Sequence, residues 1–479
     1  MARDRSQESE VRSQKSEVRI KIGIIGIGIG IGIPIPISIS NLPRVRACFG
    51  ENKKLFVALG SGTRAGGKKL SKEIMKRKKM KQVSRHGFSM LLIALCLALL
   101  PASKALAARN IIFMVPDGMG LSNVTLARTY LYGPAGQRLS FESLPYIGYQ
   151  RTTSRNSYVT DSAAAGSAWA CGEKFNNRAV SCLDADGDGQ CDQTRKNRQT
   201  ILELAAARGM ATGLVATSDI THATPAAFGA HVHHRKCESE IFSQLIANSI
   251  DVLLGGGVAT NRGPCKLEHT DKKLAARQIE RAESHGYTVV RDRHALENAR
   301  EAEKLLGLFS DDGLTPVFER GASSREPTLA EMTRCALGIL EKEENGFFLM
   351  IEGSQIDWAN HAREVNYLIG EMIDFDNAVK AVRGWIERKP EQRGDNTLLI
   401  VVSDHETGGV ILEGPYGALP PDGEAGAVDV TFASNAANPD ESAGHTAVDS
   451  LIWSNQPQCA GAMENTDLFY IMKDFLETD

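Results

Sequence analysis

The sequence NIIFMVPDGMG, residues 110–120, joins a continuous apolar run to a polar turn. The same arrangement returns twice, where the apolar residues 346–351 and 397–402 each run into acidic or histidine side chains. A strand without alternating polar residues is buried on both faces, which is typical of a parallel sheet covered by helices. The three runs therefore predict three buried strands of one sheet.

Helix-like stretches separate these strands, for example residues 199–208 and 368–388. Strands that alternate with helices along the chain build a sheet with helices packed on both of its faces. We therefore expect an α/β fold, specifically a three-layer α/β/α sandwich with a mostly parallel central sheet. In such sheets, ligands bind at the carboxyl ends of the strands.

The side chains that follow the three strands share a chemistry. Asp117, Glu352 and the pair Asp404-His405 all fall where a strand ends, although they lie far apart in the sequence. One carboxylate after a strand carries little information. Three strands that end in the same way predict a functional site at this edge of the sheet.

Further candidate metal ligands lie in the sequence beyond the residues that directly follow the strands. Asp357 and His361 are four residues apart, which places both on one face of a helix. His445 follows a glycine in a turn-like context. Zinc binds imidazole nitrogen and carboxylate oxygen. A lone histidine is more often a satisfied polar residue than a ligand, but here the Asp/His pairs coincide with strand ends and with a candidate nucleophile.

That candidate nucleophile is Ser162, within the sequence VTDSAAAGSAW of residues 159–169. The small residues after it favour a helix that begins near the serine, and the free N–H groups of a helix start stabilise an alkoxide or a phosphate. A serine needs a base or a metal to become a nucleophile. Because no histidine neighbours Ser162 in the sequence, that help must come from elsewhere in the fold.

Charge divides the 479-residue chain into two parts. Residues 1–107 carry 21 Lys/Arg and 6 Asp/Glu, whereas residues 108–479 carry 34 Lys/Arg and 52 Asp/Glu. The acidic balance of the longer part argues against nucleic acid as a partner, because phosphate backbones need a basic surface.

The basic part divides further. Residues 75–107 combine a basic start, an apolar run and an Ala-Leu-Ala cleavage pattern, which together predict a secretory signal peptide. Residues 1–74 contain a low-complexity Ile/Gly/Pro alternation, so we expect translation to begin downstream of them, at Met75 or Met80. Residues 108–479 are then one catalytic domain, periplasmic or secreted, with no membrane span after cleavage of the signal.

Export also permits disulfides. Cys182 and Cys191 bracket a short stretch of chain and are expected to pair. Between them, Asp184, Asp186 and Asp188 stand at alternate positions and a glycine follows, like the first half of a calcium loop. The bidentate glutamate of an EF-hand is missing, so weak calcium binding and a plain acidic surface turn are both open.

Seven motifs occur in one order along residues 109–479: PDGMG, TDSAAAGSAW, ATPAAFGAHVHHRKC, IEGSQIDWANHA, SDHETGG, GHTAV and the terminal TDLFYIMKDFL. In this set and order they resemble the alkaline phosphatase family. The resemblance implies an alkaline phosphatase-like fold and metal-dependent hydrolysis of phosphate monoesters to alcohol and inorganic phosphate through a phosphoserine intermediate. It also implies two zinc ions, one magnesium ion, small-molecule substrates and a homodimer.

The resemblance further implies a role for each matching residue. The implied ligands of the first zinc ion are Asp357, His361 and His445. Those of the second zinc ion are Asp117, Asp404 and His405. Those of the magnesium ion are Asp117, Thr224 and Glu352. Ser162 resembles the nucleophile, Arg235 the residue that binds the phosphate, and Asp161 a residue that orients Arg235.

Two positions depart from the best-known bacterial pattern of the family. His222 stands where an aspartate is common, and Trp358 stands where a lysine is common. A histidine near the third ion could itself ligate zinc, which leaves the metal at that position open. A tryptophan in place of a cation would weaken inhibition by phosphate. Both residues are candidate substrate-binding residues, together with Arg235.

Two other functions fit part of these features. A phosphodiesterase of the same superfamily would share the metals, but Arg235 and the magnesium ligands suit the dianionic phosphate of a monoester better. A non-catalytic metal-binding secreted protein would need neither Ser162 nor Arg235. The leading interpretation is therefore a phosphomonoesterase.

Overall fold

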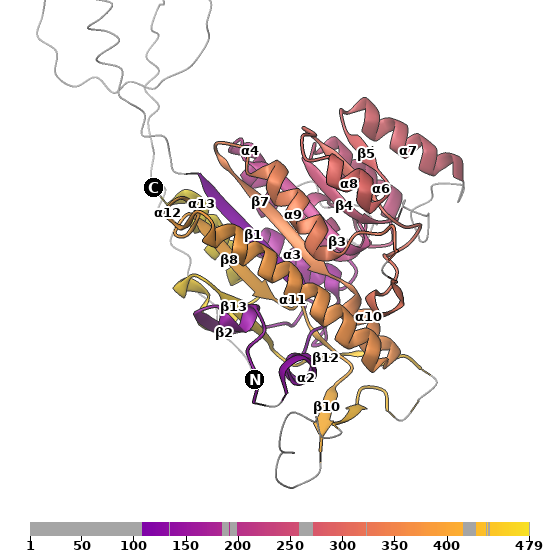
Figure 1. Ribbon diagram of the computed structural model, residues 1–479, viewed down its shortest axis with the longest axis vertical. Coiled ribbons are helices and arrows are strands. Elements are labelled where there is room, and N and C mark those ends of the chain that lie inside the picture. Colours follow the sequence, from indigo (N-terminus) through magenta and orange to yellow (C-terminus); the bar gives the residue numbers. More distant parts are fainter. Residues whose placement is uncertain are drawn as a thin grey trace, which may run out of the picture. The chain divides into compact units, whose positions relative to one another are not determined.

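The computed structural model describes residues 108–133, 135–183, 191, 199–257, 272–321, 323–414, 428–436, 438 and 441–478. Within these ranges a ten-stranded sheet forms the middle layer, and helices cover both of its faces (Figure 1). The predicted three-layer α/β/α sandwich is therefore confirmed.

The strands of the sheet lie in the order β14-β2-β13-β8-β1-β7-β3-β4-β6-β5. In the part of the chain that the structure describes, nine of them share one direction and only β13 runs against its neighbours. The bounds are β1 (Arg109–Pro116), β2 (Tyr146–Arg151), β3 (Ala211–Asp219), β4 (Val252–Gly256), β5 (Thr288–Val290), β6 (Leu305–Leu308), β7 (Gly346–Gly353), β8 (Thr397–Val402), β13 (Ser450–Ser454) and β14 (Gly461–Glu464).

The three strands predicted from the sequence are neighbours at the centre of this sheet. β1 pairs with β7 on one side and with β8 on the other, in parallel. Pro116 is in register with Gly353, and Met114 is in register with Val401, so the three strands end at nearly the same level. This register brings the residues that follow the strands to one edge of the sheet.

Side chains of β1 alternate between two hydrophobic cores. Ile111, Phe113 and Val115 belong to one core, whereas Ile112 and Met114 belong to the other, and all five are fully buried. Successive residues of a strand point to opposite faces of the sheet. An uninterrupted apolar strand is therefore what a sheet with two covered faces requires.

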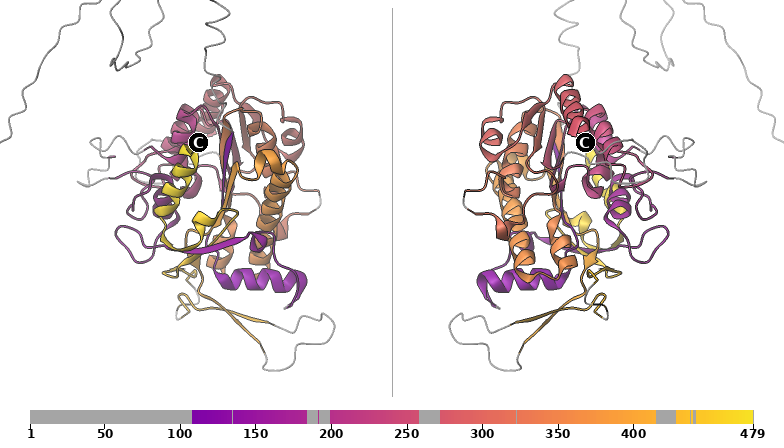
Figure 2. Two further views of the ribbon diagram at one scale, coloured as in Figure 1. Left: turned by 90° about the vertical axis from the view of Figure 1, so that its left-hand side faces the viewer. Right: turned by 90° about the vertical axis from the view of Figure 1, so that its right-hand side faces the viewer.

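The helices divide between these two cores, and Figure 2 shows them as layers on either side of the sheet. The first core includes α3 (Ser162–Cys171), α4 (Ile201–Ala207), α5 (Ala223–Gly229), α6 (Glu238–Ala247), α7 (Lys272–Ser284) and α13 (Asp467–Glu477). The second includes α2 (Leu121–Tyr132), α8 (Arg293–Asn298), α9 (Leu329–Leu340), α10 (Gln355–Ala362) and α11 (Val365–Glu387). α12 (Pro390–Arg393) follows α11. The helices predicted at 199–208 and 368–388 are confirmed as α4 and α11. No described helix is long and apolar enough to cross a membrane.

Two small antiparallel pairs of strands follow β8 in the chain. β9 (Glu406–Thr407) pairs with β12 (His445–Thr446), and β10 (Val410–Glu413) pairs with β11 (Asp429–Phe432). The first pair corrects the turn-like context expected around His445, because its backbone is held in a strand opposite Thr407.

Candidate active site

Buried charged residues line the carboxyl edge of the sheet. Asp117 follows β1, Glu352 lies near the end of β7, and Asp404 and His405 follow β8. All four side chains are completely buried. The structure thus brings together strand-end residues from three distant parts of the chain.

The first candidate metal group consists of Asp357, His361 and His445. α10 places the first two one turn apart, with Nε2 of His361 3.3 Å from Oδ2 of Asp357. His445 comes from β12, and its Nε2 lies 3.1 Å from Nε2 of His361 and 3.5 Å from Oδ1 of Asp357. A tetrahedral zinc ion with bonds of about 2.0–2.1 Å needs ligand atoms roughly 3.4 Å apart. The three atoms fit such an ion.

Backbone carbonyls orient the two histidines of this group. Nδ1 of His361 donates to the carbonyl of Ala443, and Nδ1 of His445 donates to the carbonyl of Thr160 at 3.0 Å. A proton on Nδ1 leaves the lone pair on Nε2, which is the atom turned towards the group. Sequence reasoning missed these partners, because every residue has a carbonyl and no side-chain pattern marks the ones that are used.

The second group consists of Asp117, Asp404 and His405. Nε2 of His405 lies 3.1 Å from Oδ2 of Asp404 and 3.7 Å from Oδ1 of Asp117. Oδ1 of Asp404 accepts the backbone N–H of Gly118 at 3.1 Å. Gly118 has a φ of +72°, and a Cβ there would stand 2.8 Å from Asp357. Only glycine therefore lets the first two groups approach each other in this way.

The third group joins Asp117 and Glu352 to His222, the residue that precedes α5. Burial raises the pKa of Glu352 to about 7, although the hydrogen bond from the Ser354 hydroxyl acts to lower it. The resemblance implied Asp117, Thr224 and Glu352 as ligands here. The structure brings Asp117 and Glu352 together with the imidazole of His222, which the sequence already suggested as a ligand near the third ion, and Thr224 lies beside Glu352.

Several buried polar atoms of the three groups have no hydrogen-bond partner among the described residues. They are both carboxyl oxygens of Asp117, Oε1 of Glu352, Oδ2 of Asp404, Oγ1 of Thr224 and Nδ1 of His222. A buried polar atom left unsatisfied costs about 1–3 kcal/mol. Cations bound at the three groups would satisfy these atoms, so the donor set fits metal ions.

Crowding of like charges acts most strongly on Asp117. Burial raises the pKa of this carboxyl well above its usual range, and the carboxylates of Asp404, Asp357 and Glu352 raise it further. Carboxyls packed in this way are ionised together only when positive charge balances them. The electrostatics at the carboxyl edge of the sheet therefore also favour bound cations.

Ser162 is the first residue of α3, as the sequence predicted. Asp161 caps this helix, since its Oδ1 accepts the N–H of Ala164 at 3.0 Å. Ser162 is buried, and its Oγ lies 3.4 Å from Nε2 of His405. The fold therefore brings Ser162 beside a candidate ligand of the second metal group, although no histidine neighbours the serine in the sequence.

Arg235 is anchored by two contacts of its guanidinium. Nη1 donates to Oδ2 of Asp161 at 3.0 Å, and Nη2 donates to Nε2 of His222 at 3.0 Å. Burial alone would raise the pKa of Asp161, but the charge of Arg235 holds it below the usual range. This geometry fits the expectation that Asp161 orients Arg235.

Trp358 adjoins the third group. Its ring centroid lies 5.9 Å from that of His222, with the two rings edge to face. A Cβ at Gly313 would come within 2.5 Å of the indole, so the chain passes directly over it. The structure therefore places the two residues that depart from the common family pattern against each other.

Thr407 is a residue that sequence reasoning missed. Its hydroxyl contacts Asp357 of the first group and His405 of the second. The available signal was its position two residues after His405, which in extended chain places both side chains on one face. That signal is weak, because any residue two positions from a candidate ligand shares it.

The disulfide between Cys182 and Cys191, predicted from the sequence, is confirmed. The candidate calcium ligands Asp184, Asp186 and Asp188 lie outside the described residues. Calcium binding by this stretch stays a prediction.

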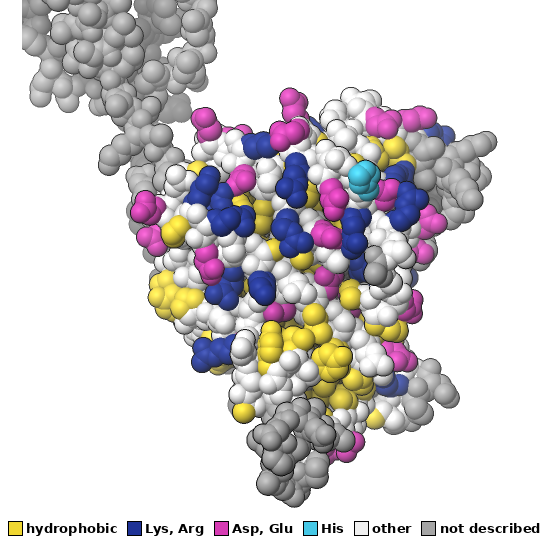
Figure 3. Space-filling view, viewed as in Figure 1, with side chains coloured by type: hydrophobic (Ala, Val, Ile, Leu, Met, Phe, Trp, Pro, Cys, Tyr) yellow, Lys and Arg dark blue, Asp and Glu magenta, His cyan; other side chains and the backbone are white. Residues whose placement is uncertain are grey.

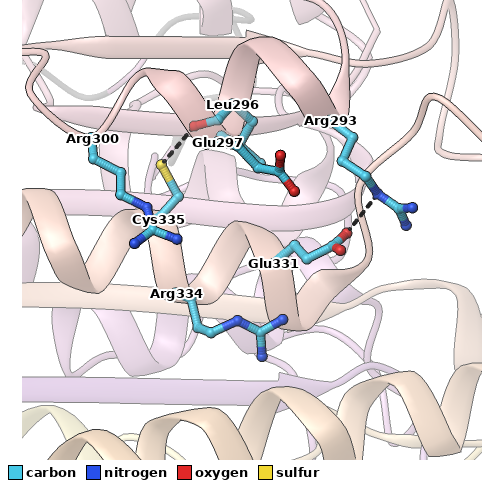
Figure 4. A pocket seen from close by; sticks show the side chains of 7 residues that line it. All are labelled: Arg293, Leu296, Glu297, Arg300, Glu331, Arg334 and Cys335. Carbon is cyan, nitrogen blue, oxygen red and sulfur yellow. Dashed lines mark hydrogen bonds and ion pairs between the residues drawn. The ribbon is translucent and has the colours of Figure 1, made fainter.

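A separate hollow of about 130 Å³ lies between α8 and α9 (Figure 4). Nε of Arg293 pairs with Oε2 of Glu331 at 3.0 Å on one side of it. On the other side, Sγ of Cys335 donates to the carbonyl of Leu296 at 3.6 Å. Burial raises the pKa of the Cys335 thiol to about 11, so this thiol is not a nucleophile at neutral pH. None of the candidate site residues lines this hollow.

Comparison with known proteins identifies the family of the chain. The family model described as alkaline phosphatase matches residues 108–420. The alkaline phosphatase of Escherichia coli K12 is 34% identical over 423 residues, which cover 76% of this chain and 85% of that protein. The streptomycin-6-phosphate phosphatase of Streptomyces griseus is 34% identical over 427 residues, which cover 76% of this chain and 89% of that protein.

Solved structures share the fold. The alkaline phosphatase of the Antarctic bacterium TAB5 is 30% identical, with a TM-score of 0.62, and the match covers 78% of this chain and 99% of that one. The Thermus thermophilus alkaline phosphatase is 25% identical, with a TM-score of 0.64, and the match covers 79% and 96%. These relationships exclude the non-catalytic alternative. The chain belongs to the alkaline phosphatase family and is a metal-dependent phosphatase.

Proposed function

We propose that the chain hydrolyses phosphate monoesters to alcohol and inorganic phosphate through a phosphoserine formed on Ser162. The observation that carries this proposal is the position of the Ser162 hydroxyl, at the start of α3 and 3.4 Å from Nε2 of His405. A helix start stabilises negative charge on the hydroxyl oxygen and on a phosphate bound there. The relative named for streptomycin 6-phosphate supports a small-molecule phosphate ester as the substrate class.

In the proposed reaction, the Ser162 hydroxyl releases its proton as Oγ attacks phosphorus. The bond between phosphorus and the alcohol oxygen breaks, and that oxygen takes up a proton to leave as the alcohol. Water then cleaves the phosphoserine, which releases inorganic phosphate and regenerates the serine. Zinc at the first and second groups and magnesium at the third would supply positive charge that stabilises the attacking and leaving oxygens.

Arg235 is proposed to bind the phosphate. A guanidinium carries five N–H groups, and the contacts with Asp161 and His222 use two of them. The other N–H groups are available to phosphate oxygens, and the two contacts already fix the plane of the guanidinium. A monoester dianion gains more from this charge than a diester monoanion, so a phosphodiesterase is the second candidate.

The decisive experiment compares wild type with Ser162→Ala. We expect kcat/KM for p-nitrophenyl phosphate to fall about 10³-fold or more, with fold and metal content unchanged. Brief incubation of wild type with labelled phosphate at acid pH, followed by denaturation, should leave label on Ser162. Full activity in the alanine variant, or label on another residue, would refute the phosphoserine. Faster hydrolysis of bis(p-nitrophenyl) phosphate would favour the phosphodiesterase.

The identity of the third metal depends on His222. Magnesium prefers oxygen ligands, whereas imidazole suits zinc. A histidine-to-aspartate variant of the TAB5 enzyme, 29% identical to this chain with a TM-score of 0.61, was solved with magnesium bound in its M3 site. We predict that His222→Asp raises the ratio of magnesium to zinc in the purified protein. Metal analysis of both proteins after equilibration with the two ions checks this, and an unchanged ratio would contradict it.

We propose that residues 75–107 are a cleaved signal peptide and that the enzyme acts in the periplasm or outside the cell. The disulfide between Cys182 and Cys191 and the start of the family match at residue 108 support export. Residues 1–74 then lie upstream of the true start. The N-terminal sequence of the exported protein tests the proposal, because a mature protein that retains residues before 108 would contradict it.

We also propose that the enzyme is a homodimer. Figure 3 shows hydrophobic side chains gathered in the lower part of the face that it draws, where Figure 1 places α2 and β10. Leu121 and Tyr130 of α2 are 61% and 65% exposed, and Ile411 of β10 is 46% exposed. Apolar patches of this kind mark protein contacts. Sedimentation velocity tests the proposal, and a monomer at micromolar concentration would overturn it.

A further inference from the structure

One hydroxyl lies between the first and second metal groups. It belongs to Thr407 of β9, a completely buried residue. Oγ1 of Thr407 is 2.5 Å from Oδ1 of Asp357 and 3.2 Å from Nδ1 of His405. Because Asp357 belongs to the first group and His405 to the second, one side chain contacts a candidate ligand of each.

The chemistry of the three groups sets the direction of both hydrogen bonds. An ionised carboxylate accepts hydrogen bonds but donates none, and a hydroxyl has a single proton to donate. The Thr407 hydroxyl therefore donates to Asp357, and its oxygen accepts from Nδ1 of His405. Nδ1 then carries the imidazole proton, which leaves the lone pair on Nε2.

That nitrogen is the atom of His405 that faces the site. Nε2 lies 3.1 Å from Oδ2 of Asp404 and 3.4 Å from Oγ of Ser162. The Thr407 hydroxyl thus selects the form of His405 whose lone pair points into the second group. At the same time it holds one oxygen of Asp357, the ligand candidate that lies within 3.5 Å of both histidines of the first group.

The backbone fixes Thr407 relative to both groups. Its N–H donates to the carbonyl of Gly118 at 3.0 Å, directly after Asp117 in the chain. Within the pair of β9 and β12, Thr407 stands opposite His445. The hydroxyl is therefore held by segments that also carry candidate ligands, and it needs no rearrangement to orient them.

We propose that Thr407 is a positioning residue that orients Asp357 and His405 and so sets the metal affinity of both groups together. The proposal rests on the metal sites of the proposed function. Without the hydroxyl, Asp357 loses a hydrogen bond and His405 loses the acceptor that fixes its tautomer. Loss of such an outer partner weakens metal binding by about 10–100-fold. Because one hydroxyl serves both groups, both should be weakened.

The experiment measures zinc affinity of the full chain after removal of metal, by competition with a chromophoric chelator. Thr407→Ala removes the hydroxyl, whereas Thr407→Ser removes only the methyl group. Each variant is made in two further backgrounds. His445→Ala disables the first group so that the second is measured, and Asp404→Ala disables the second so that the first is measured. We expect Thr407→Ala to lower zinc affinity about 10–100-fold in both backgrounds and Thr407→Ser to stay close to the parent protein.

Thr333 supplies a matched control. It is a fully buried threonine of α9, and its Oγ1 donates to the carbonyl of Leu329 at 2.8 Å, within its own helix. Thr333→Ala and Thr333→Ser make the same chemical changes away from the metal groups. Zinc affinity should be unchanged in both, which separates loss of a hydroxyl at Thr407 from loss of any buried hydroxyl.

The outcomes distinguish this proposal from the function on which it rests. Wild type that binds fewer than two zinc ions would overturn the metal sites and the role of Thr407 with them. Wild type with both ions but unchanged affinity in Thr407→Ala would overturn the role of Thr407 alone. Weakening in one background only, or equal weakening in Thr407→Ser, would overturn it as well. If circular dichroism shows that the alanine variant does not fold, Thr407→Val replaces it in the same comparison.

Discussion

Two regions of this phosphatase bury carboxylates, and they satisfy them in opposite ways. At the carboxyl edge of the sheet, both oxygens of Asp117 and Oε1 of Glu352 have no hydrogen-bond partner among the described residues. On α11, by contrast, Asp374 and Asp376 are buried and accept hydrogen bonds from backbone N–H groups of other segments.

The carboxylates of α11 hold neighbouring segments in place. Oδ2 of Asp374 accepts the N–H of Leu329, the first residue of α9, at 3.1 Å. Oδ1 of Asp376 accepts the N–H groups of Ser140 at 2.6 Å and Phe141 at 3.4 Å, and its Oδ2 accepts the Ser140 hydroxyl at 3.0 Å. The N–H groups of Leu329 and Phe141 are buried and would otherwise lack partners, whereas Ser140 is half-buried.

The difference shows how buried acids divide between structure and function. An acid that receives donors from the protein stabilises the fold, whereas an acid left bare costs stability until a cation binds. Both kinds look alike in the sequence, as Asp or Glu among apolar residues. Their hydrogen-bond partners tell them apart.

The largest test of this comparison is Asp117→Asn, because Asp117 belongs to both the second and the third group. We expect kcat/KM for p-nitrophenyl phosphate to fall about 10³-fold or more, together with loss of bound metal. The metal-free variant should be at least as stable as metal-free wild type, since the change removes one of several crowded carboxyls. Thermal unfolding in the presence of a chelator measures this. A metal-free variant that unfolds more easily would show that Asp117 also supports the fold.

The opposite result is expected for Asp376→Ala. Removal of this acceptor leaves three donors without a partner, and at about 1 kcal/mol each the free energy of unfolding should fall by about 3 kcal/mol. Urea denaturation measures the loss, and kcat/KM and metal content per folded molecule should not change. Asp376→Asn keeps an oxygen acceptor and should lose less. Reduced metal content in the folded alanine variant would contradict the division between the two regions.

The smallest effect is expected at Glu371 of α11, a buried acid with one hydrogen-bonded oxygen and one oxygen without a partner among the described residues. Its Oε1 accepts the N–H of Val317 at 2.7 Å, but its Oε2 has no partner among the described residues. Burial raises the pKa of this carboxyl to about 7, above the ordinary value of about 4.3 in the unfolded chain. The stability that Glu371 contributes is therefore complete below about pH 4.3 and is lost as the pH rises through about 7, where the folded carboxyl must ionise.

The glutamine in Glu371→Gln cannot ionise, so this variant should not lose that stability as the pH rises. We expect the free energy of unfolding of the variant, relative to wild type, to rise by about 2–3 kcal/mol between pH 5 and pH 8. Urea denaturation at both pH values provides the measurement, and Glu387→Gln is the control, because it makes the same change at an exposed glutamate of the same helix. Parallel pH profiles for Glu371→Gln and wild type would show that Glu371 stays ionised in the folded protein.

Much of the site followed from local patterns. The strands that end at Asp117, Glu352 and Asp404 were visible as uninterrupted apolar runs, since burial on both faces excludes polar residues. The spacing of Asp357 and His361 predicted one face of a helix, and small residues after Ser162 predicted a helix start. The order of the motifs along the chain then gave the resemblance to the alkaline phosphatase family, and that resemblance implied a role for each residue.

The sequence by itself therefore determined the candidate site residues and the elements that present them, because hydrophobic periodicity and helix spacing are properties of neighbouring residues. Only the tertiary structure decided which oxygen and nitrogen atoms meet. The register of β1 with β7 and β8, the meeting of His222 with Asp117 and Glu352, and the Thr407 hydroxyl between two groups all depend on contacts between distant segments. Such contacts are set by how whole layers pack, and no local pattern encodes a distance of a few ångströms between atoms far apart in the chain.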